Sequence, residues 1–107
     1  MAAAMTGLFE PEGLPEMLAE REAIGLICGG LTPAQARAQA AADAEAWRHQ
    51  CEVRYVLRFR VEIGPDWRDA YLDKVERARG KAAADKLRQD CADQWALGSR
   101  GAKGDWR

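Results

Sequence analysis

The chain has 107 residues, of which 48% are hydrophobic and 31% charged, and its formal net charge is −1. This length suits one domain that buries roughly 65% of its unfolded surface, and the composition is too apolar for a fully disordered chain. A net charge so close to zero gives no independent reason to infer binding to nucleic acid or to a membrane surface.

The three cysteines, Cys28, Cys51 and Cys91, are odd in number and widely spaced. This pattern fits neither a disulfide framework nor a zinc ligand pair, and it indicates reduced thiols that pack in the interior. The first ten residues lack the basic and apolar parts of a secretory signal, and no apolar run approaches the ~20 residues of a membrane span. We therefore expect a cytoplasmic protein, and we expect it to need no metal and no cofactor.

Helix-breaking residues indicate the structure of residues 1–30. Residues 1–13 end in FEPEG and show no periodicity, so we predict an N-terminal arm. A first helix is predicted over residues 14–28, because Pro15 is tolerated in a first turn and the glycines at 29–30 end a helix.

A second helix begins with a strong signal. Thr32 is a good N-cap, Pro33 suits the first helical position, and an alanine-rich run follows. Residues 57–63, LRFRVEI, alternate apolar and charged side chains as a strand does, but no second strand is available to pair with them. We therefore expect the helix to continue to about Arg60, over a length of ~42 Å.

Two further helices are expected over residues 66–79 and 81–97, separated by Gly80. Each carries an apolar stripe at helical spacing: Trp67, Tyr71, Val75 and Ala78 in one, and Ala83, Ala84, Leu87, Cys91 and Trp95 in the other. Residues 98–107 form a Gly-rich basic tail that we expect to be mobile. The prediction is an all-α fold of four helices in a single domain, residues 14–97, with a long central second helix and a C-terminal αα-hairpin packed across it.

The only histidine invites a catalytic interpretation. On a helix, however, His49 and Cys51 lie ~200° apart, so they cannot act as a Cys–His pair or share a metal. Glu45 and Glu52 lie within a turn of His49, and an acid/base site of these three residues is conceivable. The plainer interpretation is a histidine at the edge of the core with its ring satisfied by one glutamate. No other catalytic constellation accompanies it, so we predict that the protein is not an enzyme.

The second helix carries two apolar stripes, and both need to be covered. One consists of Ala42, Ala46, His49, Val53, Val56 and Leu57, and the other of Ala40, Ala44, Trp47, Cys51 and Tyr55. Because a chain of this length can hardly cover both stripes, a protein partner or a second copy of the chain is expected. The predicted contact surface consists of Trp47, Tyr55, Arg54 and Arg58.

Arginines interleaved with aromatic residues can also bind phosphates and stack on bases. The alternative function is therefore nucleic-acid binding, with contacts from Arg48, Arg54, Arg58, Arg60 and Lys81. Glu52 and Glu62 interrupt this basic run, so a solvated or salt-bridged face is a third interpretation of the same residues.

Two segments, RHQCEVRYVLRF at 48–59 and YLDKVERARGKAAADKLRQD at 71–90, resemble small uncharacterised helical proteins of tailed phages and prophages. The pattern is R-H-x-C-E-V-R followed by Y-L-x-x-V-E-x-x-R-G-x-x-A-A-x-x-L, and it covers about half of the chain. Residues 21–40 are also similar to a helix–Gly-Gly-Leu-Thr–helix segment of phage and plasmid replication proteins. The resemblance implies no activity. It implies a phage accessory protein in a bacterial cell, and we expect that protein to act by binding a host or phage protein, as a monomer or a homodimer.

Overall fold

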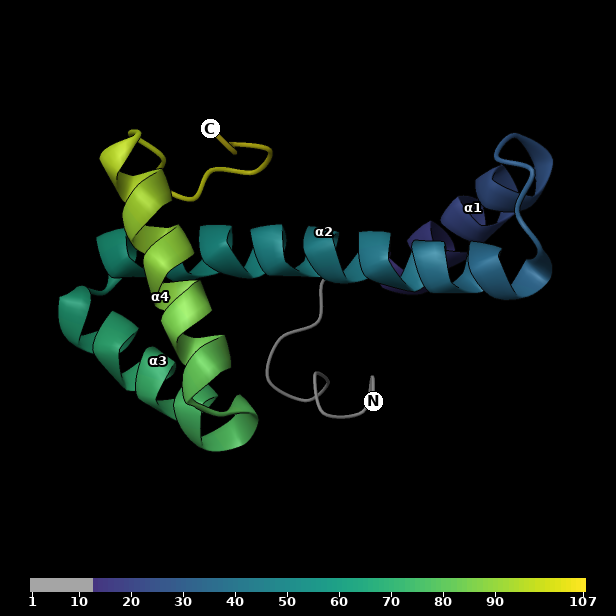
Figure 1. Ribbon diagram of the computed structural model, residues 1–107. Coiled ribbons are helices and arrows are strands. Elements are labelled where there is room, and N and C mark those ends of the chain that lie inside the picture. The colour runs from purple at the N-terminus through teal and green to yellow at the C-terminus, as the bar shows by residue number, and fades with distance from the viewer. Residues whose placement is uncertain (1–12) are drawn as a thin grey trace. The chain divides into compact units, whose positions relative to one another are not determined.

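The computed structural model describes residues 13–107, apart from the side chain of Ile27, and these residues form four helices and no strand (Figure 1). The helices are α1 (Leu14–Ile27), α2 (Pro33–Glu62), α3 (Pro65–Arg79) and α4 (Lys81–Ala96). The all-α prediction is confirmed, as are the long second helix and the hairpin of the last two helices packed against it. The predicted arm falls almost entirely outside the described residues.

The start of α2 is set by a reciprocal capping box. The Thr32 Oγ1 atom accepts a hydrogen bond from the Gln35 backbone N–H at 3.2 Å, and Gln35 Oε1 accepts one from the Thr32 N–H at 3.0 Å. These bonds satisfy amide groups that a helix start leaves without partners.

The end of α2 lies two residues beyond the predicted one. The strand-like segment LRFRVEI is helical through Glu62, and Gly64, with φ of 135°, separates it from Pro65 at the start of α3. Alternation alone does not make a strand, because an unpaired strand leaves its backbone groups unsatisfied whereas a helix satisfies them internally.

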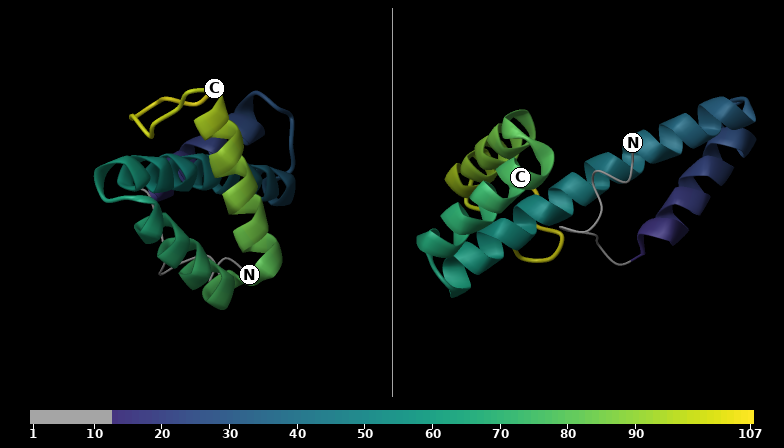
Figure 2. Two further views of the ribbon diagram at one scale, coloured as in Figure 1. Left: turned by 90° about the vertical axis from the view of Figure 1, so that its left-hand side faces the viewer. Right: turned by 90° about the horizontal axis from the view of Figure 1, so that it is seen from below.

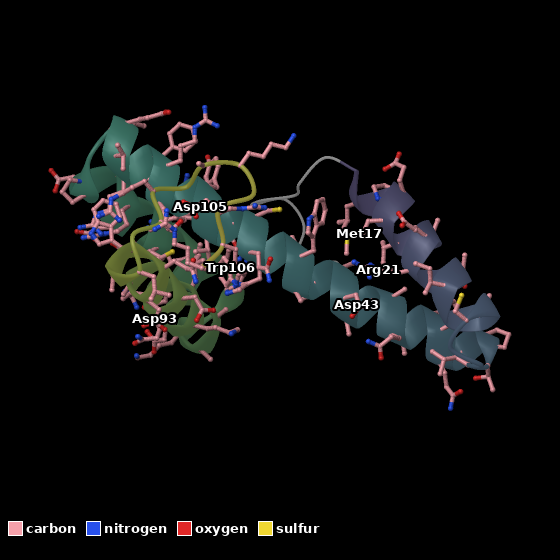
Figure 3. All side chains as sticks on the ribbon, turned by 90° about the horizontal axis from the view of Figure 1, so that it is seen from above. Met17, Arg21, Asp43, Asp93, Asp105 and Trp106 are labelled. Carbon is pink, nitrogen blue, oxygen red and sulfur yellow. The ribbon has the colours of Figure 1, made fainter. Side chains whose placement is uncertain are left out.

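The described residues form two compact units, residues 13–49 and 50–107, and α2 contributes to both. In the smaller unit, small residues of α2 are buried: Ala36, Ala40 and Ala44. Gly25 of α1 lies so near that a Cβ atom there would be 3.3 Å from the Ala36 Cβ. Figure 3 shows Met17 and Arg21 of this unit on α1 and Asp43 on α2. The domain limits expected at residues 13 and 97 stay predictions.

The stripes expected on α2 are only partly correct. Val53, Val56 and Leu57 are buried as predicted, but Ala42 and Ala46, assigned to the same stripe, are exposed. Alanine carries little information about direction because it is common on both faces of a helix.

The larger unit contains the main core, formed by the last three turns of α2 with α3 and α4 (Figure 2). The core residues are Val53, Val56, Leu57, Tyr71, Leu72, Val75, Ala84, Leu87 and Cys91. A single residue, Gly80, connects α3 to α4, and its φ of 96° allows the sharp reversal. Most residues of the predicted stripes thus meet in the core, but Ala78 is exposed and Ala83 is half-buried outside the core cluster.

The segment after α4 makes specific contacts within the larger unit. Gln94 Nε2 donates to the Arg107 carbonyl oxygen and Gln94 Oε1 accepts from the Arg107 N–H, both at 2.8 Å. Ser99 and Gly101 are buried, and Figure 3 labels Asp105 and Trp106 in the same segment. Mobility of residues 98–107 stays a prediction, and these contacts oppose it.

Gly101 and Gly104 provide a matched test of these contacts. A Cβ atom at Gly101 would collide with the backbone carbonyl oxygen of Arg54 and the backbone nitrogen of Arg58, whereas one at Gly104 would meet nothing within 4 Å. Both glycines have positive φ, 85° and 79°, so alanine adds similar backbone strain at each. We expect Gly101→Ala to accelerate amide hydrogen exchange over residues 99–107 at least about tenfold more than Gly104→Ala. Equal exchange in the two variants would show that the close approach does not hold the segment.

Candidate functional site

The larger unit buries the carboxylate of Glu52 completely, with its side chain 0% exposed. Tyr71 Oη donates to Oε2 at 2.6 Å, and Arg79 donates from Nη1 and Nη2 to Oε1 and Oε2 at 2.7 and 2.8 Å. Burial, and then the hydrogen bond to Glu52, raise the pKa of Tyr71. This Glu52 network ties α2 to the middle and to the C-terminal end of α3, and the bidentate pairing of Arg79 with Glu52 is the strong form of an ion pair.

The catalytic hypothesis around His49 gains no support from these contacts. Glu52 is bonded to Tyr71 and Arg79, and Glu45 accepts hydrogen bonds from Arg48 Nε and Nη2 at 3.0 and 2.8 Å. The two carboxylates expected beside His49 thus each bind at least one arginine, and the acid/base site stays a prediction. Because α2 is helical from Pro33 to Glu62, His49 and Cys51 point in different directions, as the sequence predicted.

Three of the four residues predicted to contact a protein lie together. Arg54, Tyr55 and Arg58 line an open groove of about 240 Å³. Its other lining residues are Cys51, Phe59, Gly101 and Lys103; we call it the Arg54–Lys103 groove. Arg54 Nη2 donates to Cys51 Sγ at 3.1 Å, and Arg58 pairs with exposed Glu62 at 3.1 Å. Trp47, the fourth predicted residue, belongs to the smaller unit and is half-buried.

The groove borders an aromatic cluster that the sequence reasoning missed. The ring centroids of Tyr55 and Phe59 are 4.8 Å apart, and the Trp67 centroid lies 5.7 and 5.2 Å from those of Tyr55 and Phe59, respectively. Tyr71 stacks on Trp67 at 5.2 Å. The i, i+4 spacing of Tyr55 with Phe59 and of Trp67 with Tyr71 was the available signal. Tyr55 therefore packs against the core in addition to lining the groove.

A second, more enclosed pocket, also of about 240 Å³, is lined by residues of all three helices of the larger unit. The lining residues are Leu57, Arg60, Arg68, Asp69, Leu72, Arg88, Cys91 and Ala92; we call it the arginine pocket. The guanidinium carbons of Arg60 and Arg100 each lie 3.7 Å from the Trp95 ring centroid. Burial, with repulsion from Arg68 and Arg100, lowers the pKa of Arg60.

The five basic residues predicted to bind nucleic acid do not form one surface. Arg54 and Arg58 line the groove, whereas Arg60 lines the arginine pocket. Arg48 is only 4% exposed and pairs with Glu45, and Lys81 pairs with Asp85 at 2.7 Å at the start of α4. Sequence reasoning also missed Arg68, Arg88 and Arg100, which lie on separate segments.

The three cysteines occupy different environments. Cys91 is buried, and its burial raises the pKa of the thiol to about 12. Cys51 is half-buried beside Arg54, whereas Cys28 is exposed after the end of α1, contrary to the expectation that it packs in the interior. Among residues 13–107, no three His, Cys, Asp or Glu side chains are grouped to hold a metal ion.

Removing one partner of the Glu52 network should destabilise the protein strongly. Glu52→Gln leaves the buried Arg79 guanidinium without its counter-charge, and we expect a loss of about 3–5 kcal/mol in the free energy of unfolding. Glu62→Gln removes the same charge from the exposed pair with Arg58 and should cost less than about 1 kcal/mol. Urea denaturation followed by circular dichroism measures both values. Similar losses in the two variants would contradict a structural role specific to Glu52.

Thiol labelling at pH 8 should distinguish the cysteines by their rates of alkylation. Iodoacetamide reacts with thiolates, and the raised pKa of Cys91 together with its burial keeps that thiol protonated and covered. We expect Cys28 to be alkylated first, and Cys91 only in denaturant, as read by peptide mass spectrometry. Alkylation of Cys91 in the folded protein at the rate of Cys28 would show that the core opens readily.

Comparisons with known proteins place the chain in a family. The search of curated proteins and the search of solved structures each found no match. No helix within residues 13–107 has the length and apolar character needed to cross a membrane. The model of a family of unknown function, DUF7696, matches residues 40–98. The matched range is more than half of the chain, and it contains the Glu52 network, the aromatic cluster and the whole lining of the arginine pocket. The chain therefore belongs to the DUF7696 family.

Proposed function

We propose that the protein is a non-enzymatic interaction protein that binds an acidic segment of a partner protein in the Arg54–Lys103 groove. The observation that carries this proposal is the lining of the groove, which contains three cationic side chains and no carboxylate. Arg54, Arg58 and Lys103 supply the charge, and Tyr55 and Phe59 supply apolar contact area.

Such a lining favours a segment that alternates carboxylates with apolar side chains. The arginine guanidinium pairs with a carboxylate through two parallel hydrogen bonds, and tyrosine and arginine are enriched among the residues that contribute most to binding at protein interfaces. The Arg58–Glu62 pair is exposed on both sides, with 64% and 49% of the side chains accessible, so a partner carboxylate can replace Glu62 at little cost.

The cellular setting of the proposal comes from the sequence. The resemblance to small proteins of tailed phages and prophages supports an accessory factor in the bacterial cytoplasm, with a host or phage protein as the partner. A second copy of the chain is the other protein partner to be tested, by light scattering coupled to size exclusion.

Nucleic-acid binding is the alternative, because Arg54 and Arg58 beside Tyr55 and Phe59 also suit phosphates and stacked bases. The two functions differ in their salt dependence. Binding of a nucleic acid releases condensed counterions and weakens steeply with salt, whereas an acidic-apolar peptide retains its apolar contacts.

Fluorescence anisotropy with two labelled probes tests the proposal. One probe is a peptide of alternating Glu and Leu with a single Trp, and the other is a single-stranded oligonucleotide. The double variant Arg58→Gln, Lys103→Gln should bind the peptide about tenfold or more weakly, because each charge-assisted hydrogen bond is worth about 1.5–3 kcal/mol. The matched control Lys74→Gln, Arg77→Gln removes the same charge from exposed positions on α3 that line neither pocket, and should change affinity less than about twofold.

The outcomes are distinct. If the control variant loses as much peptide affinity as the groove variant, binding depends only on the net charge of the protein. If the peptide does not bind at low ionic strength, the proposal is wrong. Tighter binding of the oligonucleotide, with a steep salt dependence and loss in the groove variant, would favour the alternative. Trp47→Ala then shows whether the smaller unit contributes. Tyr55→Ala is a poor probe, since it also opens the aromatic cluster.

A further inference from the structure

We infer that the arginine pocket is a binding site for a phosphate group, separate from the groove and independent of the function proposed for it. The site is formed where Arg60 of α2, Arg68 of α3 and Arg88 of α4 border one pocket. All three side chains and the rest of the lining lie in the larger unit and inside the range matched by the family.

The pocket combines a cationic rim with an apolar floor. Leu57, Leu72 and Ala92 supply apolar surface, and Cys91 adds a thiol that burial keeps neutral, with a pKa of about 12. The floor therefore carries no negative charge that would repel an anion. An apolar lining also keeps the local dielectric low, which strengthens the attraction between the guanidinium groups and a bound anion.

The positive charge of the rim exceeds its negative charge. Three arginines face one lining carboxylate, Asp69, which pairs with Arg68 at 2.9 Å. Arg88 pairs with Asp85, a residue that does not line the pocket and that also binds Lys81. Within residues 13–107, Arg60 has no ion pair, and its guanidinium lies on the Trp95 ring.

The environment of Arg60 carries an excess of positive charge, although Asp69 acts in the opposite direction. The pKa of Arg60 is lowered by burial first, and then by the nearby positive charges of Arg68 and Arg100. Cations gathered in this way repel one another, and a bound anion converts the repulsion into attraction. The folded protein thus holds in place an arrangement of charge that an anionic ligand stabilises.

The number of arginines distinguishes phosphate from carboxylate. A carboxylate offers two oxygens, which one or two guanidinium forks satisfy, as in the Glu52 network. A terminal phosphate offers three acceptor oxygens and a charge of about −1.5 to −2 at pH 7, which suits three arginines on different helices. At about 240 Å³, the pocket is smaller than most sites for whole small molecules, so it suits one phosphate with a short part of the attached ligand.

Calorimetry and ¹⁵N NMR with three probes test the site: inorganic phosphate, pyrophosphate and a single-stranded oligonucleotide, each at low ionic strength. We expect at least one probe to bind and to shift the Arg60 Nε–H and Trp95 indole N–H signals, since Arg60 lines the pocket and its guanidinium lies on the Trp95 ring. Arg68→Gln and Arg88→Gln should each weaken binding about tenfold or more, because each removes a guanidinium group that donates charge-assisted hydrogen bonds to the phosphate. Arg77→Gln, an exposed change on α3, should alter it less than about twofold.

The pattern across probes identifies the source of the phosphate. Binding of phosphate or pyrophosphate indicates a small phosphorylated ligand, and binding of the oligonucleotide alone, still sensitive to Arg68→Gln, indicates a phosphate of a nucleic-acid chain. The inference is overturned if no probe binds, or if Arg77→Gln weakens binding as much as the pocket variants do. It is also overturned if Arg58→Gln, in the groove, removes the binding while Arg68→Gln and Arg88→Gln leave it intact. Thermal melts of each variant verify that the fold is retained.

Discussion

The buried carboxylate of Glu52 is the constraint on which the larger unit depends. Burying an ion costs several kcal/mol unless its partners are placed correctly, and here the partners are Tyr71 and Arg79, near the middle and at the end of α3. Any slide of α3 along α2 breaks one of these bonds and leaves a buried charge unpaired. The apolar core supplies most of the driving force for folding, and the Glu52 network selects the register in which that core forms.

This register places two cationic sites on different faces of one helix. Tyr55 and Leu57 are two residues apart, hence ~200° apart around α2. Tyr55 lines the groove together with Arg54 and Arg58. Leu57 lines the arginine pocket together with Arg60. Because α3 and α4 pack against the same turns of the helix, Arg68 and Arg88 come to border the second site. The Glu52 network thus fixes the helices that carry the groove and the arginine pocket, although none of its three residues lines either site.

The sequence was informative wherever a local signal determines structure. Thr32, Pro33, Gly64 and Gly80 mark helix ends through their backbone preferences, and the predicted boundaries lie within two residues of those observed. The Glu52 network could not be predicted in this way, because Glu52 and Arg79 are 27 residues apart and both look like surface residues in a periodicity analysis. The same limit applies to the arginine pocket. Arg60 was noted for its place in a basic run, but Arg68 and Arg88 join it only through the packing of three helices.

The net charge of −1 conceals this arrangement, because a sum over 107 residues says nothing about position. Many of the acidic side chains are paired on the surface one turn from a cation, as in Lys81–Asp85 and Lys86–Asp90, and such pairs largely cancel at a distance. The residues that line the groove have no carboxylate among them, and those of the arginine pocket have one. Electrostatic recognition depends on such local imbalances, and this nearly neutral chain has an excess of positive charge at two separate places.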